Sequence, residues 1–135
     1  MLRKINLRAY GKINLGLDVI KKREDGYHEV RMIMQTVSVY DILELIIQER
    51  PGIQVETNLS YLPVNEDNLV YKAADLLIRE FKIRRGIKII LKKFIQVAAG
   101  MAGGSSDAAA VLFGINRLFS LGLSKEALMK RVVKI

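Results

Sequence analysis

Hydrophobic and polar residues alternate along the first part of the chain, with the period of a half-buried β-strand. Within residues 4–20 the alternating apolar positions are Ile5, Leu7, Ile13, Leu15, Leu17 and Val19. Gly11 falls between two strand segments and predicts a bend or bulge. A charged loop at 21–25 and a turn at Gly26 then lead to an extended stretch at 29–39, which predicts a hairpin.

Two further extended pieces, 43–48 and 53–57, are separated by the turn residues Pro51 and Gly52. Strands joined by short turns usually pair with each other in opposite directions. We therefore expect the strands up to residue 57 to form an antiparallel sheet.

The hydrophobic period changes to that of a helix after a polar cluster that ends at Asn68. We predict a helix at 68–82, with Asp67 or Asn68 as its N-cap, and then a strand of mixed alternation at 87–97. A loop of small residues leads into another helix, whose core face would hold Ala109, Leu112, Phe113 and Leu118.

Ser124 is a good N-cap for a last helix, which we expect to continue through Ile135. Its apolar stripe consists of Leu128, Val132 and Ile135, and no later segment completes the packing of that stripe. The sequence thus predicts an α+β domain spanning residues 1–135, truncated in its last helix and forming the N-terminal part of a longer protein.

Composition excludes several classes of protein. Half of the 135 residues are hydrophobic, which is too many for a disordered chain, and charged residues interrupt every run long enough to span a membrane. The chain has no cysteine and one histidine, so it forms no disulfide and no zinc cluster of the usual kind. The absence of cysteine, together with the lack of a signal sequence, fits a cytoplasmic protein.

The formal net charge of +8 suits an anionic partner, such as nucleic acid, an anionic membrane surface or a phosphorylated small molecule. Lys and Arg are spread along the chain, with clusters at 21–23, 84–85, 92–93 and 125–134. We expect most of these Lys and Arg residues to lie on solvated faces, so the net charge alone does not indicate which of these partners binds.

The most informative stretch is GMAGGSSD at 100–107, between a predicted strand and a predicted helix. Glycines let backbone N–H groups approach a ligand closely, and a helix N-terminus carries partial positive charge, so the stretch suits phosphate. The P-loop pattern is excluded because no Lys precedes Ser105, and the dinucleotide fingerprint is excluded because no third glycine falls in register. A tight turn whose small residues serve helix packing is the alternative.

Three blocks of sequence resemble the GHMP small-molecule kinases, a family named after galactokinase, homoserine kinase, mevalonate kinase and phosphomevalonate kinase. The blocks are AYGKINLGLDVIKKREDGYHEV at 9–30, EDNLVYKAADLL at 66–77 and QVAAGMAGGSSDAAAVL at 96–112. The resemblance implies a fold like domain 2 of ribosomal protein S5, with a mostly antiparallel sheet, helices packed on one side, and the second GHMP domain absent. It also implies ATP-dependent phosphorylation of a small-molecule alcohol. The closest likeness is to the branch that acts on the 2-hydroxyl of a cytidine diphosphate ester of methylerythritol, in the non-mevalonate isoprenoid pathway.

The resemblance implies roles for particular residues. Lys12 matches the catalytic lysine, Asn14 lies on the same strand face, and Tyr27 and His28 match the pair that recognises cytosine. The ATP-binding residues would be Asn68, Leu69 and Lys93 around adenine, and Gln96, Val97, Ala98, Ala99, Gly100, Met101, Ala102, Gly103, Gly104, Ser105 and Ser106 around the phosphates. Ser105 or Ser106 would bind Mg²⁺.

Each of these assignments has a simpler alternative. A lone Lys12 is typical of an exposed edge strand, and Tyr27 and His28 are ordinary hairpin residues. A helix N-cap explains Asn68 equally well, and Lys93 would only decorate a strand. Family patterns also begin the phosphate loop with Pro where this chain has Gln96.

The family's catalytic Asp lies in a Gly-Ala-Asp-x-Pro segment, which this chain does not contain. Asp107 belongs to the loop motif instead, and we expect it to cap its helix. We therefore expect the chain alone to have little or no kinase activity.

Two alternatives remain open: another GHMP kinase with a different alcohol acceptor, and a basic RNA-binding module of the same fold. The second is less favoured because the basic residues are not interleaved with aromatic ones. The sequence says nothing about oligomeric state.

Overall fold

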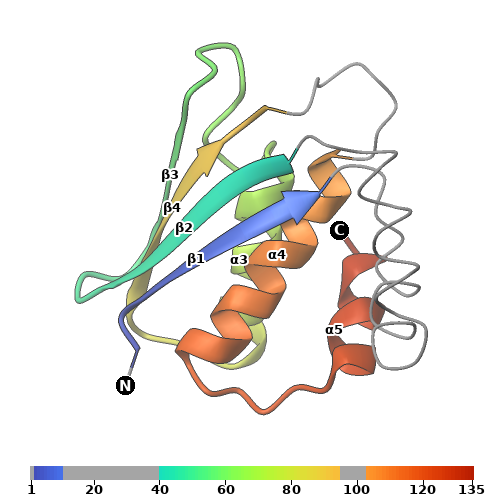
Figure 1. The fold of residues 1–135 in the computed structure, drawn as a ribbon. Helices are drawn as coiled ribbons and strands as arrows, with labels where there is room; N and C mark the ends of the chain where they lie inside the picture. The colour runs from blue at the N-terminus through green and yellow to red at the C-terminus, as the bar shows by residue number, and fades with distance from the viewer. Residues whose placement is uncertain (1, 11–39, 95–102) are drawn as a thin grey trace.

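A computed structural model of the chain describes residues 2–10, 40–94 and 103–135, with side chains in the last segment from Ser106 onward. In chain order the elements are β1 (Lys4–Tyr10), β2 (Tyr40–Gln48), β3 (Ile53–Thr57), α3 (Leu69–Glu80), β4 (Gly86–Lys92), α4 (Gly103–Leu118) and α5 (Lys125–Val132). Figure 1 shows one sheet with α3 and α4 packed against one face and α5 beside α4. The predicted α+β class and the helices on one side are confirmed.

The sheet has four strands in the order β1-β2-β4-β3. β1 pairs with β2 and β2 pairs with β4 in antiparallel fashion, whereas β3 pairs with β4 in parallel. The expectation that the strands up to residue 57 form an antiparallel sheet is therefore wrong for β3, which does not pair with β2. The reason lies in α3, which follows β3 and returns the chain along the sheet, as parallel strands require. The sheet is mixed but mostly antiparallel.

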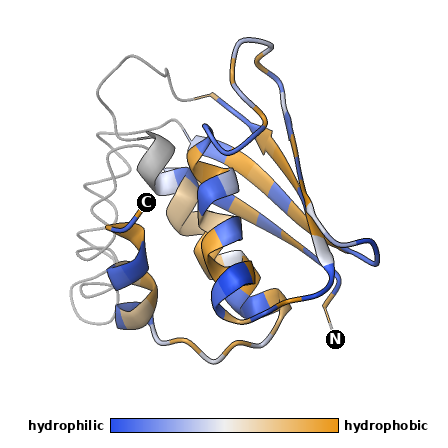
Figure 2. Ribbon diagram, turned by 180° about the vertical axis from the view of Figure 1, so that it is seen from behind, coloured by the Kyte–Doolittle hydropathy of each residue, from blue (hydrophilic) through white to orange (hydrophobic). Residues whose placement is uncertain are grey.

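The core lies between the sheet and the two helices (Figure 2). Alternate residues of the strands point into it, as the alternation predicted, and meet one face of each helix. Its largest fully buried side chains are Leu43, Leu45, Leu77, Ile87, Ile89, Leu91, Leu112, Ile115, Leu118, Val70 and Val111.

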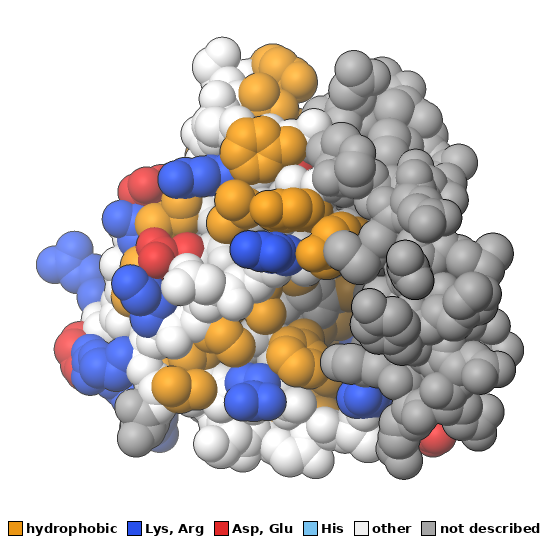
Figure 3. Space-filling view, viewed as in Figure 1, with side chains coloured by type: hydrophobic (Ala, Val, Ile, Leu, Met, Phe, Trp, Pro, Cys, Tyr) orange, Lys and Arg blue, Asp and Glu red, His pale blue; other side chains and the backbone are white. Residues whose placement is uncertain are grey.

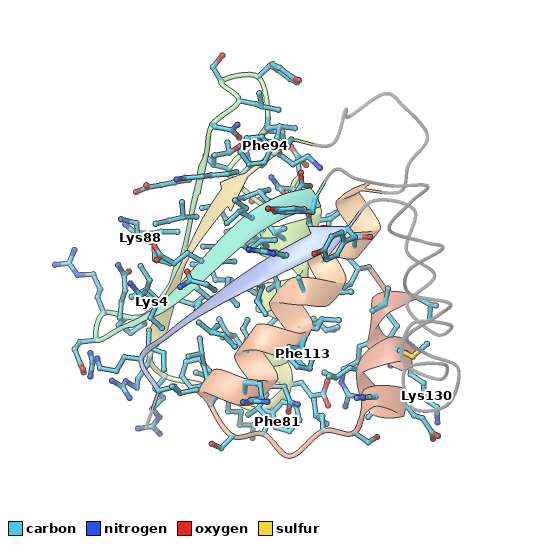
Figure 4. All side chains as sticks on the ribbon, viewed as in Figure 1. Lys4, Phe81, Lys88, Phe94, Phe113 and Lys130 are labelled. Carbon is cyan, nitrogen blue, oxygen red and sulfur yellow. The ribbon has the colours of Figure 1, made fainter. Side chains whose placement is uncertain are left out.

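Helix α4 lies close to the strands at Gly114, where an added Cβ would lie 2.3 Å from Leu45 Cδ1. Leu112 and Leu118 are buried as predicted, but Ala109 is only partly buried and Phe113 is 37% exposed. The expectation that Phe113 is a core residue is wrong, because the buried face of α4 runs through Ala108, Val111, Leu112 and Ile115 instead. Figure 4 shows Phe113 on the ribbon of this helix.

The predicted caps are confirmed: Asn68 accepts a hydrogen bond from Val70 N–H, and Ser124 accepts one from Ala127 N–H. Helix α5 ends at Val132, so the expected continuation through Ile135 is wrong. The strand predicted at 87–97 begins at Gly86, as β4, and its ladder ends at Lys92.

Several predicted features lie outside the described residues. They are the bend at Gly11, the strands within 11–39, and the site residues Lys12, Asn14, Tyr27, His28, Gln96, Val97, Ala98, Ala99, Gly100, Met101 and Ala102. Among the helices that the structure describes, none has the length and apolar character to cross a membrane.

Candidate functional site

A buried cluster of three ionisable residues lies where β2, β4 and α4 meet. The ammonium Nζ of Lys93 lies 2.9 Å from Asp41 Oδ2 and 3.0 Å from Asp107 Oδ2. The three side chains are only 6%, 0% and 2% exposed, respectively. We refer to Asp41, Lys93 and Asp107 as the buried cluster.

The local sequence explains why these side chains point inward. Asp41 is in phase with the buried residues Leu43, Leu45 and Ile47 of β2, and Lys93 directly follows β4 in phase with its inward residues. Asp107 lies in α4 next to the buried Ala108. Sequence reasoning missed Asp41, and the signal that would have found it is a charged residue at an inward position of a hydrophobic strand.

The backbone that follows β4 is held by side chains. Asn58 Oδ1 accepts a hydrogen bond of 2.7 Å from Lys93 N–H, and Asn58 Nδ2 donates one of 3.0 Å to Lys93 C=O. Asp41 Oδ1 accepts a 2.7 Å hydrogen bond from the Phe94 N–H. These bonds replace the strand ladder beyond Lys92, so the last described residues before the glycine-rich segment have fixed positions. Phe94 itself is 54% exposed at this end of the sheet (Figure 4).

Burial sets the protonation of the cluster. It raises the pKa of Asp107 to about 8, and hydrogen bonding with the Asp41 carboxyl adds to this effect, while Lys93 opposes it. Asp107 Oδ1 is also buried without a hydrogen-bond partner among the described residues, which penalises a charged carboxylate. Burial alone lowers the pKa of Lys93, but the hydrogen bond that Lys93 donates to Asp41 and the electrostatic attraction of Asp107 outweigh it, so the net change is upward. At neutral pH the cluster therefore holds a charged Lys93 facing Asp41, beside a mostly neutral Asp107.

Helix α4 begins within the motif that the sequence singled out, at Gly103. The first N–H groups of a helix have no partner within it, and the first turn of α4 contains no acidic residue, so this end suits an anion. The expectation that Asp107 caps this helix is wrong, because Asp107 lies inside α4 and its carboxyl binds Lys93. Ser106, which directly precedes Asp107 in the chain, is 5% exposed.

The other described candidates lie at the start of α3. The Asn68 side chain caps α3 and also donates a 2.9 Å hydrogen bond to the Pro63 carbonyl, while Leu69 packs partly buried against the core. The N-cap interpretation of Asn68 is confirmed, and adenine contact by Asn68, Leu69 and Lys93 stays a prediction. The assignment of Mg²⁺ to Ser105 or Ser106 also stays a prediction, because the side chain of Ser105 lies outside the described residues.

The face of the sheet that the helices leave open carries Lys and Arg among hydrophobic side chains (Figure 3). Several of these cations are paired, as in the contacts Lys4–Glu44 and Lys88–Glu56. Arg8 lies 5.0 Å from the ring centroid of Tyr40. Paired cations are less available to phosphate, and nucleic-acid binding by the chain stays an open alternative.

Residues 68–135 match the model of the GHMP kinases N terminal domain. The chain belongs to the GHMP kinase family. It is 56% identical over 131 residues to a 4-diphosphocytidyl-2-C-methyl-D-erythritol kinase of Lachnospira eligens, covering 97% of this chain and 46% of that protein. A protein of the same name from Syntrophomonas wolfei is 47% identical over 135 residues, which are 100% of this chain and 47% of that protein.

Solved GHMP kinase structures share the fold. A 4-(cytidine 5'-diphospho)-2C-methyl-D-erythritol kinase aligns with a TM-score of 0.56 and 28% identity over 95% of this chain and 46% of its own. Homoserine kinase from Cytophaga hutchinsonii aligns with a TM-score of 0.66 and 20% identity over 71% of this chain and 32% of its own. The chain thus spans about half the length of the relatives it matches.

The raised pKa of Asp107 predicts a dependence of stability on pH. The folded protein holds this proton up to about pH 8, whereas the unfolded chain releases it near pH 3.8. The stability that Asp107 contributes is therefore complete below pH 3.8 and is lost as pH rises through 8. Relative to Asp107→Asn, which does not titrate, the free energy of unfolding of the wild type should fall between about pH 5 and 8, by up to about 1.4 kcal/mol per pH unit.

Urea denaturation of both proteins at several pH values measures this difference. Asp67→Asn, at an exposed position, is the control and should leave the pH dependence of the wild type unchanged. A constant difference between wild type and Asp107→Asn from pH 5 to 9 would show that Asp107 is ionised throughout this range.

Proposed function

We propose that the chain is the ATP-binding half of a kinase that phosphorylates the 2-hydroxyl of 4-diphosphocytidyl-2-C-methyl-D-erythritol. The observation that carries this proposal is the 56% identity, across nearly the whole chain, to a protein named for that activity. The chain spans about half of such proteins, so the activity is proposed for the whole kinase. We place the reaction in the cytoplasm, in the non-mevalonate isoprenoid pathway.

The start of α4 is the described element that best fits a nucleotide. Its first turn contains no acidic residue, and the first N–H groups of any helix lack a partner within that helix, which suits the phosphates of ATP. The residues from Gln96 to Ser106 would surround these phosphates, and Ser105 or Ser106 would help to hold the Mg²⁺ that ATP carries. Magnesium neutralises charge that develops on the transferred phosphoryl group.

The acceptor side of the reaction rests on residues outside the described part of the chain. Lys12 would stabilise negative charge near the acceptor hydroxyl, with Asn14 beside it on the substrate. Tyr27 would stack on cytosine while His28 binds its edge. The proton of the hydroxyl needs a base, for which the resemblance implies an Asp that this sequence does not contain. We therefore propose that the chain alone binds nucleotide but does not catalyse phosphoryl transfer.

Isothermal titration of the purified chain with the ATP analogue AMP-PNP and Mg²⁺ tests the first half of this proposal. We expect a dissociation constant of about 1 µM to 1 mM, the usual range for enzyme substrates, and no transfer of phosphate from ATP to the methylerythritol substrate. Absence of AMP-PNP binding, together with RNA binding that weakens steeply with salt, would favour the RNA-binding module instead. Turnover at a normal kinase rate by the chain alone would contradict the need for a further residue.

Titration with cytidine diphosphate tests the identity of the substrate. Tyr27→Ala should weaken cytidine diphosphate binding by about tenfold, because a base stacked on an aromatic ring gains about 1–3 kcal/mol. Tyr61→Ala is the matched control: Tyr61 is 70% exposed, and its loss should change affinity less than twofold. Equal affinities in the wild type and Tyr27→Ala would point to a GHMP kinase with a different acceptor.

A further inference from the structure

The buried cluster joins two positions that are 14 residues apart in the sequence, Lys93 at the end of β4 and Asp107 in the second turn of α4. The glycine-rich segment that carries the chemistry connects these same two positions. Asp41 adds a second connection, because one of its oxygens binds Lys93 and the other binds the Phe94 backbone. The cluster thus ties the end of β4 and the beginning of α4 to β2.

We propose that Asp41, Lys93 and Asp107 are positioning residues that fix the first turn of α4 against the end of β4 and thereby set the affinity for ATP phosphates. The proposal rests on the proposed function for the nucleotide itself. The three side chains act through the backbone: they hold the elements on which phosphate contacts depend. They are nearly inaccessible to solvent, so they need not touch the nucleotide.

Stability alone is a poor explanation for this cluster. Replacing a buried ion pair or triad with hydrophobic residues of similar volume is often neutral or stabilising, because burial of charge is costly. The surrounding positions of β2 and β4 already hold Leu and Ile, so an apolar version of the cluster would fit the core pattern. Apolar contacts are not directional, whereas hydrogen bonds are. An apolar version of the cluster would therefore lack the hydrogen bonds that fix the distance and orientation of α4 relative to Lys93 and Phe94.

Position matters for the proposed chemistry. Displacement of a substrate-positioning group by about 1 Å can cost about 100-fold in an enzyme reaction. A helix turn that shifts while the fold stays intact would therefore weaken phosphate binding without unfolding the protein. Loss of phosphate binding with the fold intact would indicate a positioning role, whereas a purely structural role predicts loss of the fold itself.

Lys93→Met and its matched control Lys88→Met test the proposal in the purified chain. Both substitutions remove an ammonium group, from β4 or from the residue that follows it. Lys88, however, lies on the face of the sheet opposite the core and pairs with Glu56 at 3.0 Å. We expect Lys93→Met to weaken AMP-PNP binding about tenfold or more and Lys88→Met less than twofold. Equal affinities of these two variants would overturn the proposal.

A second variant keeps the test decisive if Lys93→Met unfolds because it leaves unpaired buried carboxyls. The triple variant Asp41→Leu, Lys93→Met and Asp107→Leu removes all three ionisable side chains of the cluster together and is expected to fold. The proposal predicts a folded triple variant with at least about tenfold weaker AMP-PNP binding. A folded triple variant with wild-type affinity would overturn it.

Amide hydrogen exchange without nucleotide separates positioning from direct contact by Lys93 with ATP. The triple variant should exchange faster than the wild type at residues 107–110, while helix α3 keeps its exchange rates. Unchanged exchange at 107–110 would overturn the proposal. If the wild type binds no AMP-PNP, the proposed function fails, and this exchange measurement still decides whether the cluster fixes α4.

Discussion

A lysine ammonium buried between a sheet and a helix must have its charge balanced inside the protein. Lys93 meets this requirement through the Asp41 carboxylate from β2, while the Asp107 carboxyl from α4 accepts a further hydrogen bond, each within 3.0 Å. Removal of either partner leaves polar groups unpaired in the core, which is far costlier than the loss of an exposed ion pair. These contacts therefore join β2, β4 and α4 at one end of the sheet, in addition to the β2–β4 strand pairing and the apolar core.

The rest of the described structure is consistent with this constraint. The strand ladder stops at Lys92, and side chains of Asn58 and Asp41 then hold the backbone of Lys93 and Phe94. Gly114 lets α4 approach β1 and β2 closely enough for the carboxyl of Asp107 to reach Lys93. The glycine-rich motif thus ends in a helix whose first turn contains no acidic residue and whose second turn is anchored in the core.

Much of the fold could be predicted from the spacing of hydrophobic residues, because a period of two in a strand or 3.6 in a helix indicates which side of the element is buried. The helices, the Asn68 and Ser124 caps and the mostly antiparallel sheet follow from local signals. The parallel pairing of β3 with β4 does not, because it depends on where α3 returns the chain. The exposure of Phe113 likewise depends on which face of α4 meets the strands, and several residues fit a helical stripe equally well.

The candidate site was only partly predictable. Its motif and the family's residues were visible in the sequence, but the roles of Lys93 and Asp107 depend on contacts between distant segments. Asp41 carries no motif at all and becomes visible only as a charge at an inward strand position. In the sequence Asp107 resembles a helix cap, because a carboxylate near a helix N-terminus is stabilised by the helix dipole. The sequence does not show that this carboxyl is buried and paired with Lys93.

The most direct test of the account is a double-mutant cycle on the free energy of unfolding, with Lys93→Met, Asp41→Asn and the two combined. Asparagine keeps an oxygen for the Phe94 N–H while it removes the charge that faces Lys93. If Lys93 depends on Asp41 for charge balance, the cycle should give a favourable coupling of about 2–3 kcal/mol at pH 7, with the double variant less destabilised than the sum of the single ones. A coupling below about 0.5 kcal/mol, within the range of independent sites, would contradict the central role of the cluster.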